Sequence, residues 1–201
     1  MEIIRDLEQG TPEWFALRLG VITGSKFKDV LAKGAGKTRK AYMYQLAAEM
    51  ITGEMEESYT NAEMQWGTDN EPVARAMYEL ESGNDVDEVC FVKRDEFVGV
   101  SPDGLVDYNG LVEFKCPKTT TQIETFLSGK MPTGHKAQVQ GQIWVCEREW
   151  CDFVSFDPRI DGDASFVCYR QERDDEYIKE LSEACYKFSN ELQEMVKTLK
   201  G

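Results

Sequence analysis

The hydrophobic pattern of this chain changes its period at Gly83-Asn84, and that change limits the class of fold. Before this point, apolar residues recur at helical spacing and predict helices over about 11–18, 25–31, 40–52 and 61–81. After it come short runs rich in β-branched and aromatic residues, typical of strands, over 86–92, 97–100, 105–107 and 111–115. The sequence therefore predicts an α/β fold with a central mixed β-sheet flanked by helices.

The residues after Lys115 include both helices and strands. Helices are expected over about 120–127, 134–146 and from 174 onward, and strands over 152–157 and 165–169. The helix over 61–81 should turn inward its apolar residues Ala62, Trp66, Val73, Met77 and Leu80. Neither a repeat nor a linker-like stretch divides the chain, so residues 1–201 are expected to form a single domain.

The bulk charge argues against a nucleic-acid partner, but its distribution does not. The chain has 23 basic and 37 acidic residues, a net charge of −14, whereas nucleic-acid binders usually carry a basic excess. Residues 49–96 hold 14 of the acids, while residues 1–48 are net basic. We therefore expect a small positive patch on an acidic body, formed by Lys26, Lys28, Lys33, Lys37, Arg39 and Lys40.

The six cysteines are expected to be reduced thiols. None of them forms a C-x-x-C pair and the chain has one histidine, His135, which argues against a structural zinc site. The N-terminus has no apolar segment typical of a secretory signal, and the apolar runs are too short to cross a bilayer. The expectation is a soluble, cytoplasmic protein without a membrane partner.

The segment that indicates chemistry is Ser101-Pro102-Asp103-Gly104, followed after eight residues by Glu113-Phe114-Lys115. Strand alternation puts Glu113 and Lys115 on one face with Phe114 opposite, and the preceding turn can bring Asp103 beside them. Carboxylate oxygens are hard ligands for Mg²⁺ or Mn²⁺, and a bound metal activates water for phosphodiester hydrolysis. Lys115 is then a candidate to orient or deprotonate the attacking water.

Each half of this pattern also has a purely structural interpretation. Ser-Pro-Asp-Gly is a good type I turn with no further purpose. A Glu-x-Lys pair on an exposed strand face is usually solvated and contributes little to stability. The two halves at this spacing, before a Cys116-Pro117 that ends the strand, together indicate a site.

Beyond these residues, the sequence resembles a known family. Asp103 with Glu113-x-Lys115 is similar to the PD-(D/E)XK nuclease signature, and the wider pattern resembles the bacteriophage lambda exonuclease family, or YqaJ-like viral recombinases. The similar segments occur in family order and span most of the chain: Trp14 with 17–25, Trp66-Gly67 with Glu71 and Ala74-Arg75, 101–105, 113–117, 137–140 before Trp144, and 157–159.

This resemblance implies a restriction-endonuclease-like core and a Mg²⁺-dependent exonuclease, with Mn²⁺ as an alternative metal. Such an enzyme degrades one strand of linear double-stranded DNA in the 5′ to 3′ direction from a 5′-phosphorylated end. It leaves a 3′ single-stranded overhang for recombination by strand annealing. The resemblance also implies a ring-shaped homotrimer, a single-strand annealing protein as partner, and a phage or prophage origin in the cytoplasm of a bacterial host.

The resemblance also assigns roles to individual residues. Asp103 and Glu113 would bind the metal together with the backbone carbonyl of Phe114, and Lys115 would position the attacking water. Glu71 matches an additional acidic residue near the metal, and Gln138 matches a glutamine beside the lysine. The pocket for the terminal 5′ phosphate would be formed by Arg18, Ser25 and Ser101.

Several of these residues have plainer alternatives. Glu71 lies among many acids, most of which must be solvated, and Gln140 and Gln142 are alternatives in register to Gln138. Arg18 could pair with Glu13 or Asp29 instead of phosphate. We expect the tryptophans at 14, 66 and 144 to be core residues and His135 to lie on a helix surface.

Two other functions stay open at the level of sequence. One is a PD-(D/E)XK endonuclease of restriction type, which needs no pocket for a DNA end. The other is a non-catalytic acidic protein that mimics DNA, which only the net charge favours. Cleavage of linear but not closed-circular DNA would separate the exonuclease from both.

Overall fold

The computed structural model describes residues 1–32, 37–55 and 62–201. Within these residues the strands form two sheets. The larger has the order β3-β6-β7-β8-β9: Val86–Asp87, Gly104–Val106, Gly110–Lys115, Trp150–Phe156 and Phe166–Glu172. The smaller has the order β1-β4-β5-β2: Glu2–Ile4, Phe91–Lys93, Val98–Val100 and Ile22–Thr23.

The helices fall close to the ranges predicted from the sequence. They are α1 (Pro12–Arg18), α2 (Phe27–Val30), α3 (Lys37–Thr52), α4 (Ala62–Ser82), α5 (Thr119–Ser128), α6 (Lys136–Val145) and α7 (Asp175–Lys200), with 3-10 turns at Gly24–Lys26, Thr133–His135 and Asp163–Ser165. Thr11 and Asp174 cap α1 and α7 by accepting hydrogen bonds from backbone N–H groups three residues on. Over the described ranges, no helix has the length and apolar character needed to cross a membrane.

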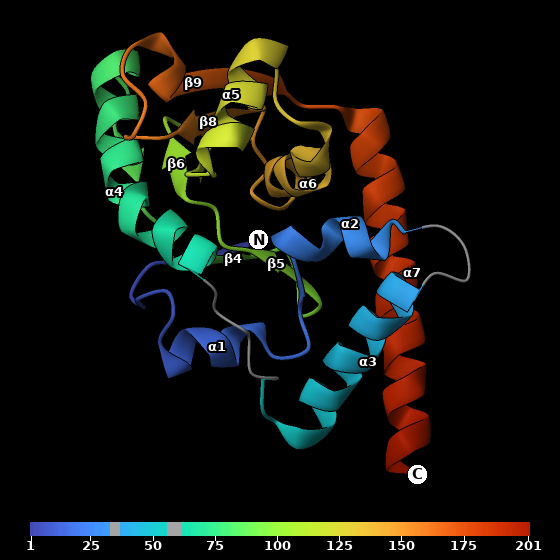
Figure 1. Cartoon of the computed structure of the whole chain (residues 1–201). Coiled ribbons are helices and arrows are strands. Elements are labelled where there is room, and N and C mark those ends of the chain that lie inside the picture. The colour runs from blue at the N-terminus through green and yellow to red at the C-terminus, as the bar shows by residue number, and fades with distance from the viewer. Residues whose placement is uncertain (33–36, 56–61) are drawn as a thin grey trace.

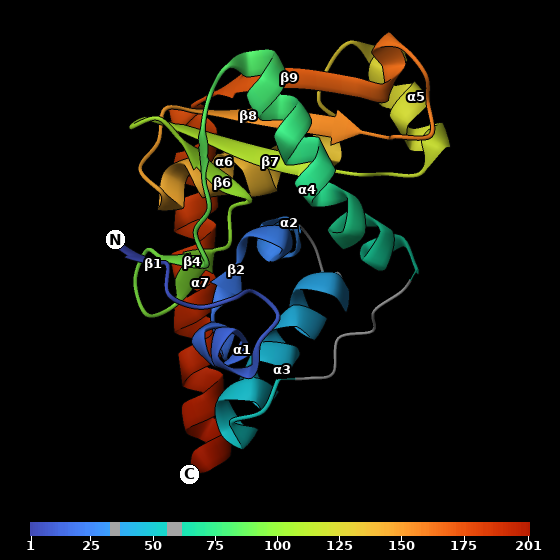
Figure 2. The ribbon, with the colours of Figure 1, turned by 90° about the vertical axis from the view of Figure 1, so that its left-hand side faces the viewer.

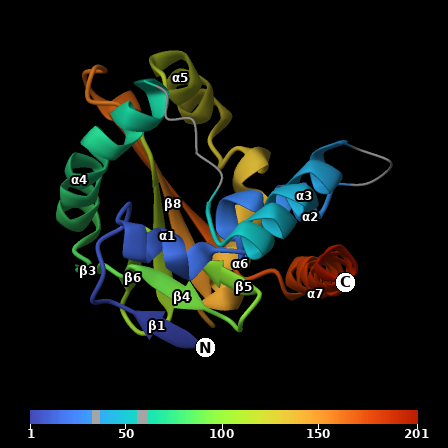
Figure 3. The same ribbon diagram turned by 90° about the horizontal axis from the view of Figure 1, so that it is seen from below.

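The larger sheet lies between α4 on one face and α6 on the other (Figures 1 and 2). On the α4 side, Ala74 and Tyr78 pack against Val112 and Phe114 of β7. The opposite side belongs to the main core, which includes Leu111, Phe153, Val139 and Ile143. Seen from below, α7 runs alongside α6 and α3, on the far side of α6 from the sheet (Figure 3). Because side chains of β7 alternate between these faces, its last residues Glu113 and Lys115 lie on the α6 side.

The predicted α/β fold with a mixed β-sheet flanked by helices is confirmed, and the strands divide between two sheets. In the larger sheet β7 and β8 run parallel, with Lys115 opposite Ser155, and the other pairs are antiparallel. Strands β4 and β5 form a hairpin, and its turn is closed by Asp95, which accepts hydrogen bonds from the N–H groups of Phe97 and Val98. Between β3 and β4 the chain crosses from the larger sheet to the smaller one. The backbone N–H of Cys90 donates a hydrogen bond to the carbonyl of Ile4 in β1, which fixes the chain beside the smaller sheet before β4 begins.

The predicted inner face of the helix over 61–81 is wrong at Ala62, Val73 and Leu80, whereas Trp66 and Met77 are half-buried. Val73 is 48% exposed and Leu80 is 76% exposed, whereas Ala74 and Tyr78 are buried. The phase is set by Tyr78, whose hydroxyl donates to buried Asp152 at 2.8 Å. The inner face therefore includes Ala74 and Tyr78 together with Met77.

Gly141 allows α6 to approach α2, and this contact predicts a large response to a small substitution. A Cβ atom at Gly141 would overlap the ring of buried Phe27. We expect Gly141→Ala to reduce the free energy of unfolding by about 1–3 kcal/mol through overpacking. Gly67→Ala in α4 is the matched control, because its Cβ meets open space and should stabilise the helix by about 0.5–1 kcal/mol. Urea denaturation of both variants would test this; equal effects would contradict it.

Candidate active site

Glu113 is the centre of the site, at the end of β7 and only 1% exposed. Its Oε1 accepts hydrogen bonds from Gln138 Nε2 at 2.5 Å and from the ammonium of Lys115. Its Oε2 accepts from Gln142 Nε2 at 2.6 Å. A buried carboxylate with three donors is fixed in orientation by charge-assisted hydrogen bonds.

Asp103 joins Glu113 from the turn before β6. Its Oδ2 accepts a hydrogen bond from the backbone N–H of Phe114 at 2.7 Å, which fixes it against the end of β7. Burial, reinforced by the negative charge of Glu113, raises the pKa of Asp103 well above its ordinary value. The structure thus brings together Asp103, Glu113 and Lys115, with Phe114 on the opposite face as strand alternation predicts.

Lys115 is an ammonium in this arrangement. Burial alone would lower its pKa, but Glu113 and Asp103 outweigh this and raise the pKa of Lys115 above its ordinary value. In this state Lys115 can orient a water. A divalent cation on Asp103 and Glu113 would offset the two charges that raise this pKa, so the role of Lys115 as a base stays a prediction.

Glu71 and Asp103 line the same cavity, of about 680 Å³, with Thr68 and Arg75 between α4 and the site. Burial raises the pKa of Glu71, although Arg75 and Lys115 act in the opposite direction. The side chain of Glu71 is 36% exposed, so it is a half-buried acid in the wall of the cavity rather than a fully solvated one. Arg75 Nη2 lies 3.7 Å from Glu71, and its Nη1 pairs with Glu88.

The glutamines of α6 separate clearly in the structure. Gln138 and Gln142, one turn apart, both contact Glu113. Gln140 lies on another face and binds the carbonyl of Glu172 and the N–H of Asp174. The sequence offers Gln142 only as an alternative to Gln138, but the i+4 spacing of the two residues places both on one helix face, where both contact Glu113.

The donor set fits a hard divalent cation. Among the described residues, no group of three or more Asp, Glu, His or Cys side chains forms a ready metal cage. Asp103 and Glu113 nevertheless face each other closely enough that one raises the pKa of the other, and a cation would relieve that repulsion. Mg²⁺ typically binds one or two carboxylates and keeps several waters, so two acids and a carbonyl suffice.

A second cavity, of about 630 Å³, lies beside the first and contains Arg18 and Ser25. Trp14 and Thr68 line both cavities, so the two adjoin. The guanidinium of Arg18 stacks on Trp14 with 4.0 Å to the ring centroid, and its buried Nε has no hydrogen-bond partner. A buried, unpartnered donor of a cation is suited to receive an anion.

The remaining residues of the predicted phosphate pocket are close but not equivalent. Ser101 does not line this cavity; it accepts a hydrogen bond from Trp14 Nε1 at 3.3 Å, behind the stacked pair. Asp29, an alternative partner for Arg18, pairs with Lys26 instead. Trp14 is half-buried: it packs against the buried cluster of Val21, Cys90 and Phe91, as the core prediction expects, and it also lines both cavities.

Only some residues of the predicted basic patch line a cavity. Lys26 lines the cavity of Arg18, and Lys28 lines a smaller one with His135 and Gln138, whereas Arg39 pairs with Glu191 of α7. Lys33 falls outside the described residues. His135 is not on the helix surface as expected: its ring packs 5.0 Å from that of Phe153, and burial lowers its pKa.

Comparison with known proteins agrees with this geometry. Residues 13–149 match the YqaJ-like viral recombinase domain, and this segment includes Arg18 of α1, Glu113 of β7 and Gln138 of α6. The chain belongs to the YqaJ-like viral recombinase family. A search of curated proteins found no match for this family member.

Solved structures of two exonucleases resemble this YqaJ-like chain over most of its length. An alkaline exonuclease, LHK-Exo, from Laribacter hongkongensis has a TM-score of 0.89 and 44% sequence identity, covering 94% of this chain and 96% of its own. The same exonuclease in complex with dAMP gives the same values. A phage-related exonuclease from Haemophilus somnus 129PT shares the fold at a TM-score of 0.69, with 16% identity over 89% of this chain and 96% of its own.

Proposed function

We propose that this YqaJ-like protein is a Mg²⁺-dependent 5′ to 3′ exonuclease of linear double-stranded DNA. It would act from a 5′-phosphorylated end as a single nuclease domain and leave a 3′ overhang for recombination by strand annealing. The observation that carries this proposal is the junction of two cavities: one holds the acidic cluster around Asp103, and the other a buried, unpartnered nitrogen of Arg18. The coarser activity, that of a deoxyribonuclease, follows from the family and from the likeness to an alkaline exonuclease.

The residues around β7 divide the catalytic tasks. Asp103, Glu113 and the carbonyl of Phe114 would hold Mg²⁺, which as a Lewis acid lowers the pKa of water and stabilises charge on phosphate. Lys115, kept as an ammonium by the two carboxylates, orients the attacking water. Gln138 and Gln142 keep Glu113 from rotating.

The second cavity supports the preference for a DNA end. A guanidinium binds phosphate oxygens through paired N–H groups, and Trp14 keeps that of Arg18 in one plane. Ser25 lines the same cavity and adds a hydroxyl, and Ser101 supports Trp14 from behind. An enzyme that cuts within a duplex needs no such pocket, which favours the exonuclease over a restriction-type endonuclease.

The assembly and partners belong to the same proposal. A homotrimeric ring would have a mass in solution of about three times 22.9 kDa, which analytical ultracentrifugation can measure. The annealing protein and the bacterial cytoplasm as the place of action rest on the family. An acidic exterior with cations near the DNA end would let such a ring slide on its substrate.

Digestion of matched DNA substrates tests this proposal. With Mg²⁺, we expect linear duplex with 5′-phosphate ends to lose one strand, while closed-circular DNA of the same sequence stays intact. Chelation with EDTA should stop the reaction, and Mg²⁺ should restore it. Cutting of the closed circle would favour the endonuclease, and an inert protein that still binds DNA-binding proteins would favour the DNA mimic.

A further inference from the structure

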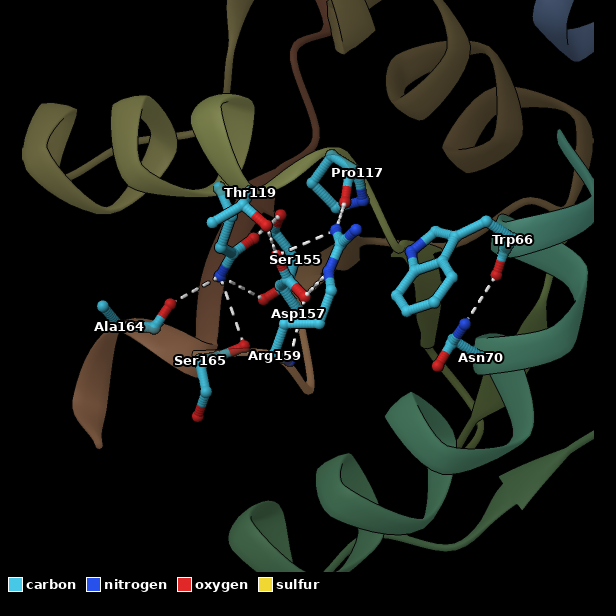
Figure 4. Close-up of polar contacts among 10 residues, drawn as sticks. Trp66, Asn70, Pro117, Thr119, Ser155, Asp157, Arg159, Ala164 and Ser165 are labelled. Carbon is cyan, nitrogen blue, oxygen red and sulfur yellow. Dashed lines mark hydrogen bonds and ion pairs between the residues drawn. The ribbon is translucent and has the colours of Figure 1, made fainter. Parts of the chain in front are cut away.

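Arg159 lies outside both cavities and makes an unusual set of contacts (Figure 4). Its Nε and Nη2 bind the two carboxylate oxygens of Asp157 at 2.7 and 3.0 Å, and its backbone N–H binds the first of these oxygens. Asp157 is fully buried and also accepts from the hydroxyl of Thr119 at 2.7 Å. The guanidinium is therefore held in one orientation at the end of β8.

The same guanidinium joins two elements that carry site residues. Nη2 donates to the carbonyl of Pro117 at 3.1 Å, and Pro117 follows Lys115 by two residues. The plane of the guanidinium stacks on Trp66 with 4.1 Å to the ring centroid, and Trp66 precedes Glu71 by five residues on α4. One side chain thus contacts both the strand end that carries Lys115 and the helix that carries Glu71.

The first half of α4 depends on contacts of this kind. The buried residues of α4, Ala74 and Tyr78, both follow Pro72, which lies inside the helix and has no N–H to donate to the preceding turn. The half before Pro72 contributes Thr68 and Glu71 to the cavity walls without a buried side chain of its own. Both side chains of the nearby ion pair between Lys118 and Glu63 are exposed, and such exposed pairs contribute little to the stability of the fold.

We propose that Arg159 is a positioning residue: fixed by Asp157, it holds the first half of α4 against the end of β7 and so sets the place of Glu71 beside Asp103 and Lys115. The inference rests on the proposed function only in that Glu71 acts in the nuclease site. A direct grip on DNA phosphate is the competing role for an exposed arginine. It is disfavoured because Nε and Nη2 already bind Asp157 and Pro117.

Trp66 offers the cleanest test, because its replacement leaves the Arg159–Asp157 pair intact. Trp66→Leu removes the stacking contact, and its Nε1 has no hydrogen-bond partner to lose. We expect Trp66→Leu and Arg159→Ala each to lower kcat on linear duplex by about 10- to 100-fold, as displaced catalytic groups do. The KM for DNA should change less than about twofold, and Trp66→Phe should recover most of the rate because it keeps a ring under the cation.

A double-mutant cycle with Glu71→Gln shows whether the effect passes through Glu71. If it does, Trp66→Leu should cost almost nothing further in that background, whereas an independent structural defect would multiply the losses. Arg173→Ala is the matched control, since Arg173 also pairs with an aspartate, Asp175, and should leave kcat unchanged.

Arg159→Lys separates positioning from phosphate binding. Lysine keeps the charge but lacks the planar fork, so we expect it to be nearly as impaired as alanine. If Arg159→Lys restores the rate, and the KM of Arg159→Ala for DNA is raised but falls at low salt, Arg159 binds DNA and the inference is overturned. Multiplicative losses with Glu71→Gln would overturn it as well. Failure of the wild-type protein to degrade DNA would instead count against the proposed function.

Discussion

Lys115→Ala is expected to reduce the rate of DNA hydrolysis by about 10²- to 10⁴-fold, the range for loss of a positioned proton-handling group. The ammonium of Lys115 contacts Glu113, and the charges of Glu113 and Asp103 raise its pKa. The measurement is single-turnover digestion of linear duplex at saturating Mg²⁺. Lys93→Ala, on strand β4 of the other sheet, is the matched control and should keep wild-type activity. A tenfold or smaller loss in Lys115→Ala would contradict the role.

The same substitution has a pH-dependent effect on stability whose sign follows from Asp103. The pKa of Asp103 in the folded state is raised by burial and by Glu113, and Lys115 opposes that shift. A carboxyl whose folded pKa is raised destabilises the fold when it must ionise, so stability falls as pH rises above its unfolded pKa. Without Lys115 this penalty grows. Lys115→Ala should therefore lose more Tm relative to wild type at pH 8 than at pH 5; an equal loss at both would contradict this coupling.

The sequence predicted the central triad of the site because its geometry is local. Alternation along β7 and one turn before β6 suffice to place Asp103, Glu113 and Lys115 together. The position of Gln138 came from the family pattern, and the structure places it on Glu113. The placement of these residues follows from side-chain alternation along one strand and from the turn that precedes it, and both are short-range features of the backbone.

The features that the sequence did not predict depend on long-range contacts. The phase of α4 is set by a hydrogen bond from Tyr78 to Asp152 across the sheet, which no helical period reveals. The environment of His135 depends on Phe153, a neighbour on another element. The bulk charge was equally uninformative, because Arg39 is neutralised by Glu191 while Arg18 and Lys26 line the cavity where phosphate is expected.

Arg18→Ala tests the end-binding pocket through the chemistry of the DNA end. We expect it to slow degradation of 5′-phosphorylated duplex by about 10- to 100-fold, since a hydrogen bond to a charged group contributes about 1.5–3 kcal/mol. Removal of the first nucleotide from a duplex with 5′-hydroxyl ends, which already lacks that contact, should proceed at nearly the rate that the wild-type protein shows on the same substrate. Arg148→Ala, whose guanidinium binds the carbonyl of Asp107 at another end of the sheet, is the control.

The comparison of the two ends separates binding of the phosphate from general attraction to DNA. A cation that merely attracts the duplex would affect both substrates equally, and that outcome would remove Arg18 from the pocket. Arg18→Lys should fall between wild type and alanine, because it keeps the charge but can neither stack flat on Trp14 nor present two parallel donors. If Arg18 selects the end, the wild-type protein also prefers 5′-phosphate over 5′-hydroxyl, and Arg18→Ala abolishes that preference. An enzyme with this selectivity starts from phosphorylated ends and binds a phosphate again after each nucleotide it removes, which is the chemical basis for successive cleavage along one strand.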